Sequence, residues 1–325
     1  MVGTNFVNVV IGVGIFSQAA LAAPEIEGVS ILSDKEVRIK PCQPVYVLLQ
    51  LVVSSDSEKP SINDIISDFS REVKVNGKAY PSYIPEANAA AFFMPIQSSV
   101  EKKEDGTFSM LTYGHLAWNY VEQDFAFHRL GVYQIEFQYG AHLKVIVDQS
   151  TPEEREVVKQ LSEIGQEFST FMVNPENAKL LDTVAPRVEK ILDRYPDTAY
   201  SRLLSVHLGF SKLRALPIPR GTRGDAIAYI AERVAICRKY FLPYVNDEIT
   251  SPWESAAAYY LARELRSYMR SNPEAPAEEL ATAKGEAIAL FQKVRDSPFS
   301  ARYRAEAEMG LRELEQREAP SAEKP

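Results

Sequence analysis

One segment of the chain carries side chains whose types and spacing suit the binding of acidic groups. Between positions 252 and 271, four residues recur every three or four positions: Tyr259, Arg263, Arg266 and Arg270. In an α-helix this spacing places all four on one side. Arginine and tyrosine are frequent anchors in protein interfaces, and a guanidinium group binds a carboxylate through paired hydrogen bonds. The segment therefore predicts a binding site for an acidic or C-terminal group of a peptide.

A second interpretation of the same segment needs no ligand. Its other side is apolar, with Leu261, Leu265 and Tyr268. The arginines would then form the solvated face of an ordinary amphipathic helix, which is the default for a charged stripe. Glu264 and neighbouring carboxylates would pair with them. The sequence leaves both interpretations open.

The histidines do not form a metal-binding motif. The chain has four of them: His115, His128, His142 and His207. No two stand four residues apart, as zinc ligands on one helix do. His115 and His128 flank Glu122 and Asp124, but so wide a spacing arises easily by chance. We therefore expect no metal and no other cofactor, and we expect His207 to be a packed or rim residue on a helix.

Motifs for a nucleophile or a phosphate loop are missing as well. The chain contains no GxSxG or SxxK sequence, and positions 220–224 hold two glycines without the GK[ST] ending of a phosphate loop. We interpret that stretch as a linker capped by Asp225. We predict no catalytic residue and no enzymatic activity. The alternative is a hydrolase of an envelope polymer with its site between two modules, because paired glycosidase carboxylates leave no fixed spacing in a sequence.

The elements that must position these residues change character at Pro152. Before it, apolar residues alternate in the two-residue period of strands, and after it they recur every three or four positions. The fold class that this predicts is multidomain, all-β followed by all-α. We expect a β domain over residues 23–150, a helical domain over residues 151–318 and a disordered tail over residues 319–325, with a separate core in each domain.

The β segment shows strand and hairpin signals. Strands are predicted at residues 27–32, 36–40, 45–54, 89–96, 108–113, 132–139 and 143–147. Asn76-Gly77 lies between alternating residues, and both residue types tolerate the positive φ of a type I′ hairpin turn. Within 132–139, Tyr133, Ile135 and Tyr139 are predicted to share one face with Phe137. Strands of this number and spacing predict an antiparallel β-sandwich.

The stretch from Leu130 to Phe137 resembles the entry to the penultimate strand of immunoglobulin-like and fibronectin type III-like domains. In those domains a tyrosine after a glycine-containing turn often forms a tyrosine corner. Tyr133 occupies the matching position here, after Gly131. The resemblance implies an immunoglobulin-like sandwich in which the Tyr133 hydroxyl bonds to a backbone group a few residues upstream.

The helical segment is divided by prolines. Thr151-Pro152 is a good helix start, because threonine can cap and proline suits the first turn. Further breaks are expected at Pro175, Pro196, Pro217, Pro219, Pro252, Pro273 and Pro298. Each proline disfavours helix in the residue before it. We predict about seven helices, mostly of about 15 to 22 residues, that pack as antiparallel hairpins.

Two stretches within the helical segment look like copies of one unit. Residues 190–199 and 291–301 each contain a proline before a helix, and these prolines lie 102 positions apart. That interval equals about three units of the 34-residue period of tetratricopeptide repeats. The phrase around Tyr195-Pro196 resembles the turn between units in exported bacterial tetratricopeptide-like proteins. The resemblance implies a tetratricopeptide-like helical array, and an irregular α-bundle is the alternative.

The N-terminus predicts export. An apolar run over residues 6–16 precedes Ala20 and Ala22, which fit the small-residue positions of a signal-peptidase site. We expect a signal peptide over residues 1–22, no membrane span after its cleavage, and a periplasmic or secreted protein. Whether Cys42 and Cys237 pair stays open, because sequence does not give their separation.

Charge limits the partner. The chain has 36 basic and 44 acidic residues, a net charge of −8, whereas nucleic-acid binders normally show a basic excess. A protein or peptide is the remaining class of partner, and the oligomeric state is not indicated. The sequence therefore predicts an exported, non-enzymatic binding or scaffolding protein of the bacterial envelope.

Overall fold

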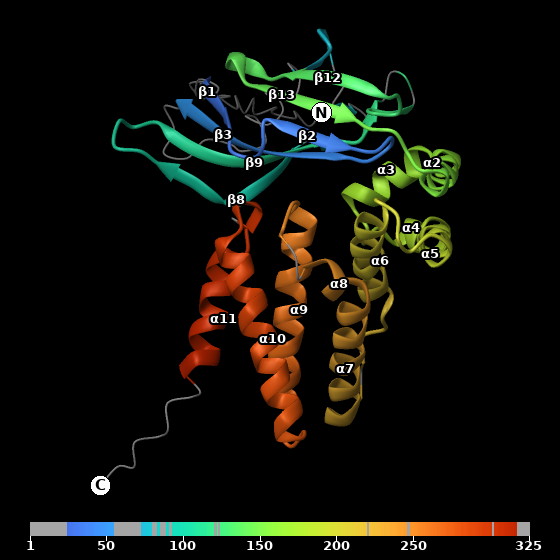
Figure 1. Ribbon diagram of the computed structural model, residues 1–325. Coiled ribbons are helices and arrows are strands. Elements are labelled where there is room, and N and C mark those ends of the chain that lie inside the picture. Colours follow the sequence, from blue (N-terminus) through green and yellow to red (C-terminus); the bar gives the residue numbers. More distant parts are fainter. Residues whose placement is uncertain are drawn as a thin grey trace, which may run out of the picture.

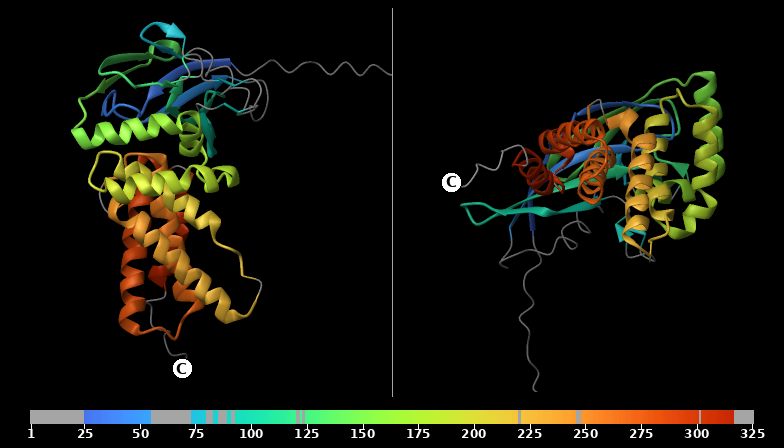
Figure 2. Two further views of the ribbon diagram at one scale, coloured as in Figure 1. Left: turned by 90° about the vertical axis from the view of Figure 1, so that its right-hand side faces the viewer. Right: turned by 90° about the horizontal axis from the view of Figure 1, so that it is seen from below.

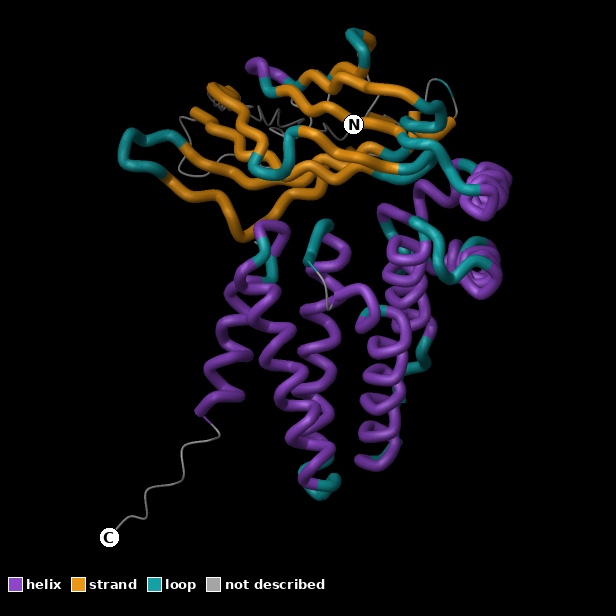
Figure 3. The backbone as a smooth tube through the Cα atoms, viewed as in Figure 1, coloured by secondary structure: helices purple, strands orange, loops and turns teal. Residues whose placement is uncertain are grey.

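In the part of the chain that the structure describes, strands come first, and the α-helices that follow lie on one side of them (Figures 1 and 3). The computed structural model describes residues 25–54, 73–79, 83–84, 89–90, 93–119, 122, 124–219, 221–245, 248–300 and 302–316. The predicted signal peptide and the predicted tail lie outside the described residues. The predicted order of strands before helices, with the change near Pro152, is confirmed.

Most described strands belong to two sheets. The first sheet is antiparallel, in the order β1 (Glu25–Ile31), β3 (Val45–Ser54), β9 (Phe108–Leu116) and β8 (Phe93–Lys102). The second has the order β2 (Glu36–Ile39), β13 (His142–Val147), β12 (Gly131–Glu136), β4 (Lys74–Val75) and β5 (Lys78–Ala79). Strand β2 runs parallel to β13, and the other pairs are antiparallel. Two small pairs join β6 (Tyr83–Ile84) to β7 (Ala89–Ala90) and β10 (Trp118–Asn119) to β11 (Asp124–Phe125).

Side chains from the two larger sheets meet in one hydrophobic cluster. Val47, Leu49 and Leu51 of β3 are fully buried there with Ile135 of β12 and Val145 of β13. The alternate residues of β3 cannot reach this cluster, because successive side chains of a strand point to opposite faces. The first sheet therefore has a second face, and the helices cover it.

The predicted turn at Asn76-Gly77 is confirmed. It joins β4 to β5, and both residues have positive φ, 51° and 73°. A type I′ turn needs this backbone conformation at both central positions.

The strand predicted over residues 132–139 is shorter in the structure. Strand β12 ends at Glu136, and Ile135 and Phe137 point into the core as expected. The placement of Tyr139 on that face is wrong, because Tyr139 lies exposed in a 3₁₀ turn over Gln138–Gly140 with a φ of 59°. Because of this turn, the alternation of buried and exposed side chains ends at Phe137, two residues before the predicted end of the strand.

Tyr133 makes the contact that its position predicts. Its hydroxyl donates a hydrogen bond of 3.0 Å to the backbone carbonyl of Arg129, four residues upstream. Its ring packs edge-on against Phe127 with the centroids 5.2 Å apart. The side chain is half-buried rather than enclosed, and burial raises the pKa of its hydroxyl.

We expect Tyr133→Phe to lower the free energy of unfolding by about 0.5–1.5 kcal/mol, because one hydrogen bond is lost. Tyr133→Ala also removes the ring contact and should lower it by about 2–3 kcal/mol. Gln134→Ala is the matched control, since Gln134 is exposed on the other face, and should cost less than about 0.5 kcal/mol. Denaturant unfolding measures all three, and equal losses would contradict a structural role for the tyrosine.

The described residues form ten α-helices, more than the seven expected. They are α2 (Pro152–Ile164), α3 (Gln166–Val173), α4 (Ala178–Thr183), α5 (Ala185–Arg194), α6 (Ser201–Ala215), α7 (Arg223–Tyr240), α8 (Leu242–Val245), α9 (Pro252–Ser271), α10 (Ala277–Asp296) and α11 (Arg304–Gln316). The difference arises because short helices such as α4 and α8 carry too few turns to show a clear periodicity. Only α6, α7, α9 and α10 reach the predicted length among these ten.

The prolines mark helix boundaries as predicted. Pro152 and Pro252 stand in the first turns of α2 and α9. Thr151 caps α2 and forms a capping box with Glu154. One boundary is different from our interpretation: α7 begins at Arg223, so part of the predicted 220–224 linker is helical, and Thr222 rather than Asp225 is the N-cap.

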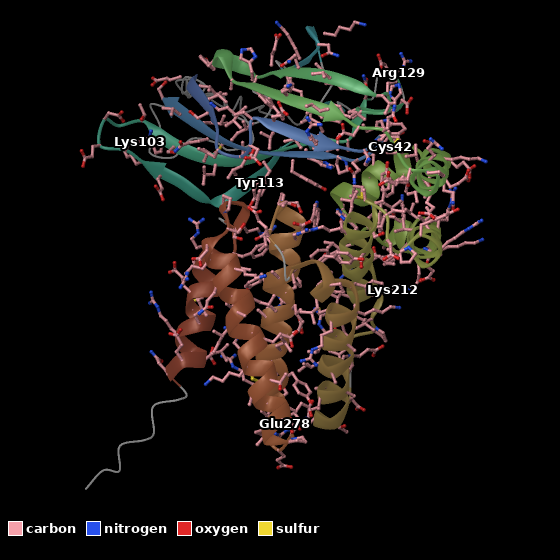
Figure 4. The ribbon with its side chains drawn as sticks, viewed as in Figure 1. Cys42, Lys103, Tyr113, Arg129, Lys212 and Glu278 are labelled. Carbon is pink, nitrogen blue, oxygen red and sulfur yellow. The ribbon has the colours of Figure 1, made fainter. Side chains whose placement is uncertain are left out.

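The hydrophobic cluster of the helices also includes residues from the strand segment. Leu48, Tyr113, Trp118 and Phe125 come from the strands or their connections, yet they belong to the same hydrophobic cluster as the helices. The Tyr113 hydroxyl donates a hydrogen bond of 2.6 Å to the carbonyl of Phe299, which follows α10, and Figure 4 shows Tyr113 above the helix ends. Figure 2 shows the helix ends meeting the strands along this boundary. The helices therefore share their cluster with a few residues of the strands, and the strands also have a cluster of their own. The domain limits and the separate cores stay predictions.

Candidate functional site

Helix α9 presents the four residues singled out in the sequence, which we call the α9 surface: Tyr259, Arg263, Arg266 and Arg270. Ser251 caps the helix by accepting a hydrogen bond from the backbone N–H of Glu254. The opposite side of α9 is apolar, and Leu261 and Leu265 are fully buried there. Burial of that side fixes the rotation of α9 and leaves the side chains of Arg263, Arg266 and Arg270 34%, 20% and 46% exposed.

Arg263 shares a buried carboxylate with a neighbouring helix. Its guanidinium lies 2.8 Å from Glu264 Oε1, and Arg233 of α7 lies 2.9 Å from the same oxygen. Burial alone would raise the pKa of Glu264, but the hydrogen bonds from Arg233 and Arg263 outweigh it and lower the pKa. Glu264 is therefore a fixed negative charge that joins α9 to α7.

Arg266 and Arg270 share a second carboxylate, that of Glu313 on α11. Arg266 lies 3.5 Å from Glu313 Oε2, and Arg270 contacts the other oxygen. The Nε atom of Arg266 is buried and has no hydrogen-bond partner among the described residues. Its guanidinium also lies 5.7 Å from the ring centre of Phe291.

Aromatic rings adjoin the arginines. Tyr259 stacks on Tyr303 with the ring centroids 4.6 Å apart, and its edge contacts Tyr260. The guanidinium of Arg263 lies 4.3 Å from the centre of the Tyr260 ring, within cation–π range. The rings hold the long arginine side chains against the helix, so less conformational entropy is lost when a ligand binds.

The α9 surface keeps a local excess of positive charge. Four guanidinium groups, those of Arg233, Arg263, Arg266 and Arg270, share the two carboxylates of Glu264 and Glu313. The Arg263 and Arg270 side chains are 34% and 46% exposed. As the second interpretation predicts, carboxylates pair with the arginines of the α9 surface. These carboxylates are fewer than the arginines, so part of the positive charge is not neutralised.

No protein-family model, curated protein or solved structure matches the chain. The chemistry of the α9 surface itself indicates what it can bind. Clustered, half-exposed guanidinium groups beside aromatic rings suit carboxylate or phosphate ligands, and provide no nucleophile.

A cleft of about 630 Å³ lies between the strands and the helices. Its walls come from five segments of the chain. They are residues 32–39 (Lys35 excepted) around β2, residues 43–46 at the start of β3, Ala199, Arg202 and Leu203 at the start of α6, residues 248–251 and 254 at the start of α9, and Pro298 and Phe299 after α10. No sequence motif could have indicated this cleft, because each segment contributes only a few ordinary residues.

An ion pair between Arg202 of α6 and Glu254 of α9 forms part of the helical wall of the cleft. The Arg202 guanidinium donates to both carboxylate oxygens of Glu254, at 2.5 and 3.1 Å. Thr250 donates to Glu254 through its backbone N–H at 2.7 Å and its hydroxyl at 3.0 Å. Arg202 also donates to the carbonyl of Glu248. The network ties the start of α6 to the start of α9.

The histidines lie in different surroundings and make different contacts. His115 on β9 is buried and stacks on Tyr46 with the centroids 5.0 Å apart. His207 is fully buried on α6, a packed residue as expected, with its ring nitrogens 2.8 and 3.0 Å from the carbonyls of Leu203 and Met172. His128 lies beside Asp124. Across the described ranges, no three His, Cys, Asp or Glu side chains form a group that could hold a metal ion.

The cysteines are buried and free. Cys42 and Cys237 form no disulfide in the structure, and burial raises the pKa of each thiol to about 12. A thiol with so high a pKa is a poor nucleophile at neutral pH. Among the described helices, none is long and apolar enough to cross a membrane.

Proposed function

We propose that the chain is an exported, non-enzymatic binding or scaffolding protein of the bacterial envelope, periplasmic or secreted, that recognises an acidic group of a protein or peptide. The observation that carries this proposal is the excess of guanidinium groups over carboxylates on the α9 surface, in a chain whose net charge is −8. The net charge of the chain is negative, so an acidic ligand gains most from a local cluster of guanidinium groups such as this one. Complementary charge of this kind selects a partner and its orientation.

We infer an immunoglobulin-like sandwich for the β domain, and the strand order supports this. The first sheet runs β1-β3-β9-β8, which corresponds to the A-B-E-D order of such domains. In the second sheet, β4, β12 and β13 correspond to the C, F and G strands. The hydrogen bond from Tyr133 to Arg129 has the geometry of a tyrosine corner.

For the helical domain we infer a tetratricopeptide-like array. Neighbouring helices such as α9 and α10 pack as pairs along the chain. Each of the two copied stretches leads into a helix with a glycine that contacts an aromatic ring, Gly209 in α6 and Gly310 in α11. A Cβ atom at Gly209 would lie 2.3 Å from the ring of Phe241, and one at Gly310 would lie 2.6 Å from the ring of Phe291. Arrays of this type bind peptides on an extended concave surface.

Binding of labelled hexaglutamate to the full chain tests the proposal. We expect the Arg263→Gln/Arg270→Gln variant to bind it about tenfold more weakly, because charged contacts at an interface are lost. Binding should also weaken as salt is added. Arg295→Gln/Arg312→Gln is the matched control, since these arginines are exposed and removing them changes the net charge equally.

The control variant should bind hexaglutamate as the wild type does, and hexalysine should not bind at the α9 surface. Equal weakening of binding in both double variants would show that only the net charge matters. Fluorescence anisotropy measures each affinity, and circular dichroism checks that each variant keeps its helices.

The alternative is an envelope-polymer hydrolase, and the cleft between strands and helices is the observation that favours it. Its buried carboxylate, Glu254, is held by Arg202 and Thr250. These donors already occupy both carboxylate oxygens, whereas a general acid or base needs an oxygen within hydrogen-bond reach of the substrate. Binding is therefore the better-supported function. Release of soluble fragments from purified envelope polymer by the wild type, and not by Glu254→Gln, would favour the hydrolase instead.

A further inference from the structure

Strand β2 is paired on one edge only among the described residues. It lies at the end of the second sheet, next to β13. The carbonyls of Lys35 and Ile39 accept hydrogen bonds of 2.9 Å from backbone N–H groups of Lys144 and Asp148. Because backbone groups of successive strand residues point to opposite edges, those of Glu36 and Arg38 point away from β13. An edge of this kind is a template for a further strand.

The cleft follows this edge of β2. Its lining includes all four residues of β2 and the preceding Leu32, Ser33 and Asp34, while the ends of α6 and α9 form the opposite wall. Figure 1 shows β2 as the strand of the second sheet that lies nearest the helices. An added strand lies about 4.8 Å from its neighbour. A cleft of about 630 Å³ has the size of an ordinary ligand site, so a short extended segment can lie beside β2.

The charges of the cleft indicate what such a segment carries. Three ion pairs account for most of the charged side chains: Arg38 with Asp148 at 3.3 Å, Glu36 with Lys144 at 2.8 Å, and Arg202 with Glu254 at 2.5 Å. Asp34 and Glu248 also line the cleft and are exposed, and neither forms an ion pair with another described residue. The charges left over are therefore negative, which favours a basic occupant.

We propose that the cleft binds an extended, basic peptide segment of a partner protein, which adds as a strand to the free edge of β2. Backbone hydrogen bonds to Glu36 and Arg38 provide the affinity, and Asp34 and Glu248 select for lysine or arginine side chains. This site is separate from the α9 surface and opposite to it in charge preference. The two proposals are independent, so an experiment that contradicts one leaves the other unchanged.

Peptide probes test the site on the intact chain. The probe is a seven-residue peptide of alternating lysine and valine, with glutamate in place of lysine in the control peptide. We expect the lysine peptide to bind and to slow amide exchange at Glu36 and Arg38 about tenfold or more, as seen by NMR. Two further peptides carry N-methyl groups on alternate backbone nitrogens, one on the odd positions and one on the even positions. Only one of them should lose binding, because only one edge of an added strand faces β2.

Two protein variants separate backbone pairing from charge. Arg38→Pro removes a free N–H without touching the β13 ladder, and Arg38→Val removes the same charge but keeps the N–H. We expect only the proline variant to lose binding by about tenfold or more. The Asp34→Asn/Glu248→Gln variant should weaken binding of the lysine peptide by about tenfold and leave hexaglutamate binding at the α9 surface unchanged.

Three results would overturn the proposal. One is equal binding of the two methylated peptides, which would show that the backbone is not read. Another is equal loss in Arg38→Pro and Arg38→Val. The third is slowed amide exchange at Glu36 and Arg38 that increases with protein concentration in the absence of peptide. That result would place a second copy of the chain on β2 instead.

Discussion

Glu264→Ala is expected to lower the free energy of unfolding by about 3–5 kcal/mol, because it leaves a largely buried guanidinium without its partner. The Arg233 side chain is only 14% exposed and donates to Glu264. Arg263 loses the same partner but is 34% exposed, so water can replace part of that contact. Denaturant unfolding followed by circular dichroism measures the change.

The matched control is Glu308→Ala. Glu308 also pairs with an arginine, Arg312, but at 4.0 Å and with side chains that are 44% and 74% exposed. A surface pair of this kind contributes at most about 1 kcal/mol. If Glu264→Ala costs no more than Glu308→Ala, the connection between α7 and α9 does not depend on this carboxylate.

Local features of the fold could be predicted from the sequence because neighbouring residues determine them. Asn76-Gly77 specifies its turn through positive φ at both positions, and Pro152 and Pro252 specify helix starts through a fixed φ and a missing N–H. Tyr133 could be placed because its position follows a glycine turn. Tyr139 could not, since the 3₁₀ turn that ends β12 leaves no signal in the alternation of residue types.

Features that join distant segments could not be predicted. The spacing of Arg263, Arg266 and Arg270 placed them on one side of α9, but it did not show that Glu313 of α11 pairs with two of them. The cleft and the shared hydrophobic cluster depend on how the outer face of the first sheet meets the helix ends. That contact depends on Leu48 and Tyr113, which as residue types look like any other members of a strand.

The boundary between strands and helices also contains the two buried histidines. His115 lies on the first sheet, opposite Tyr46 in the ladder, and His207 lies on α6, near enough to add to burial in lowering the pKa of His115. Burial lowers the pKa of His115 to about 3 and that of His207 to about 4. Hydrogen bonds to Leu203 and Met172 counteract part of the shift at His207. Both rings are therefore neutral in the folded chain at neutral pH.

Acidification from about pH 7 to about pH 5 is expected to lower the free energy of unfolding by about 4 kcal/mol, about 2 kcal/mol for each histidine. Both pKa values are lowered in the folded state. Below an ordinary histidine pKa of about 6.5 the unfolded chain binds protons that the folded chain does not, so the free energy of unfolding falls as the pH falls.

His115→Phe and His207→Gln should each remove about half of this pH dependence, whatever each substitution costs at pH 7. His142→Gln, at an exposed position on β13, should keep all of it. Urea titrations at several pH values measure the dependence, and a wild-type slope in both buried-site variants would show that other groups cause the acid sensitivity. Because the two rings lie where the strands meet the helices, protonation acts on the same boundary that forms the cleft beside β2.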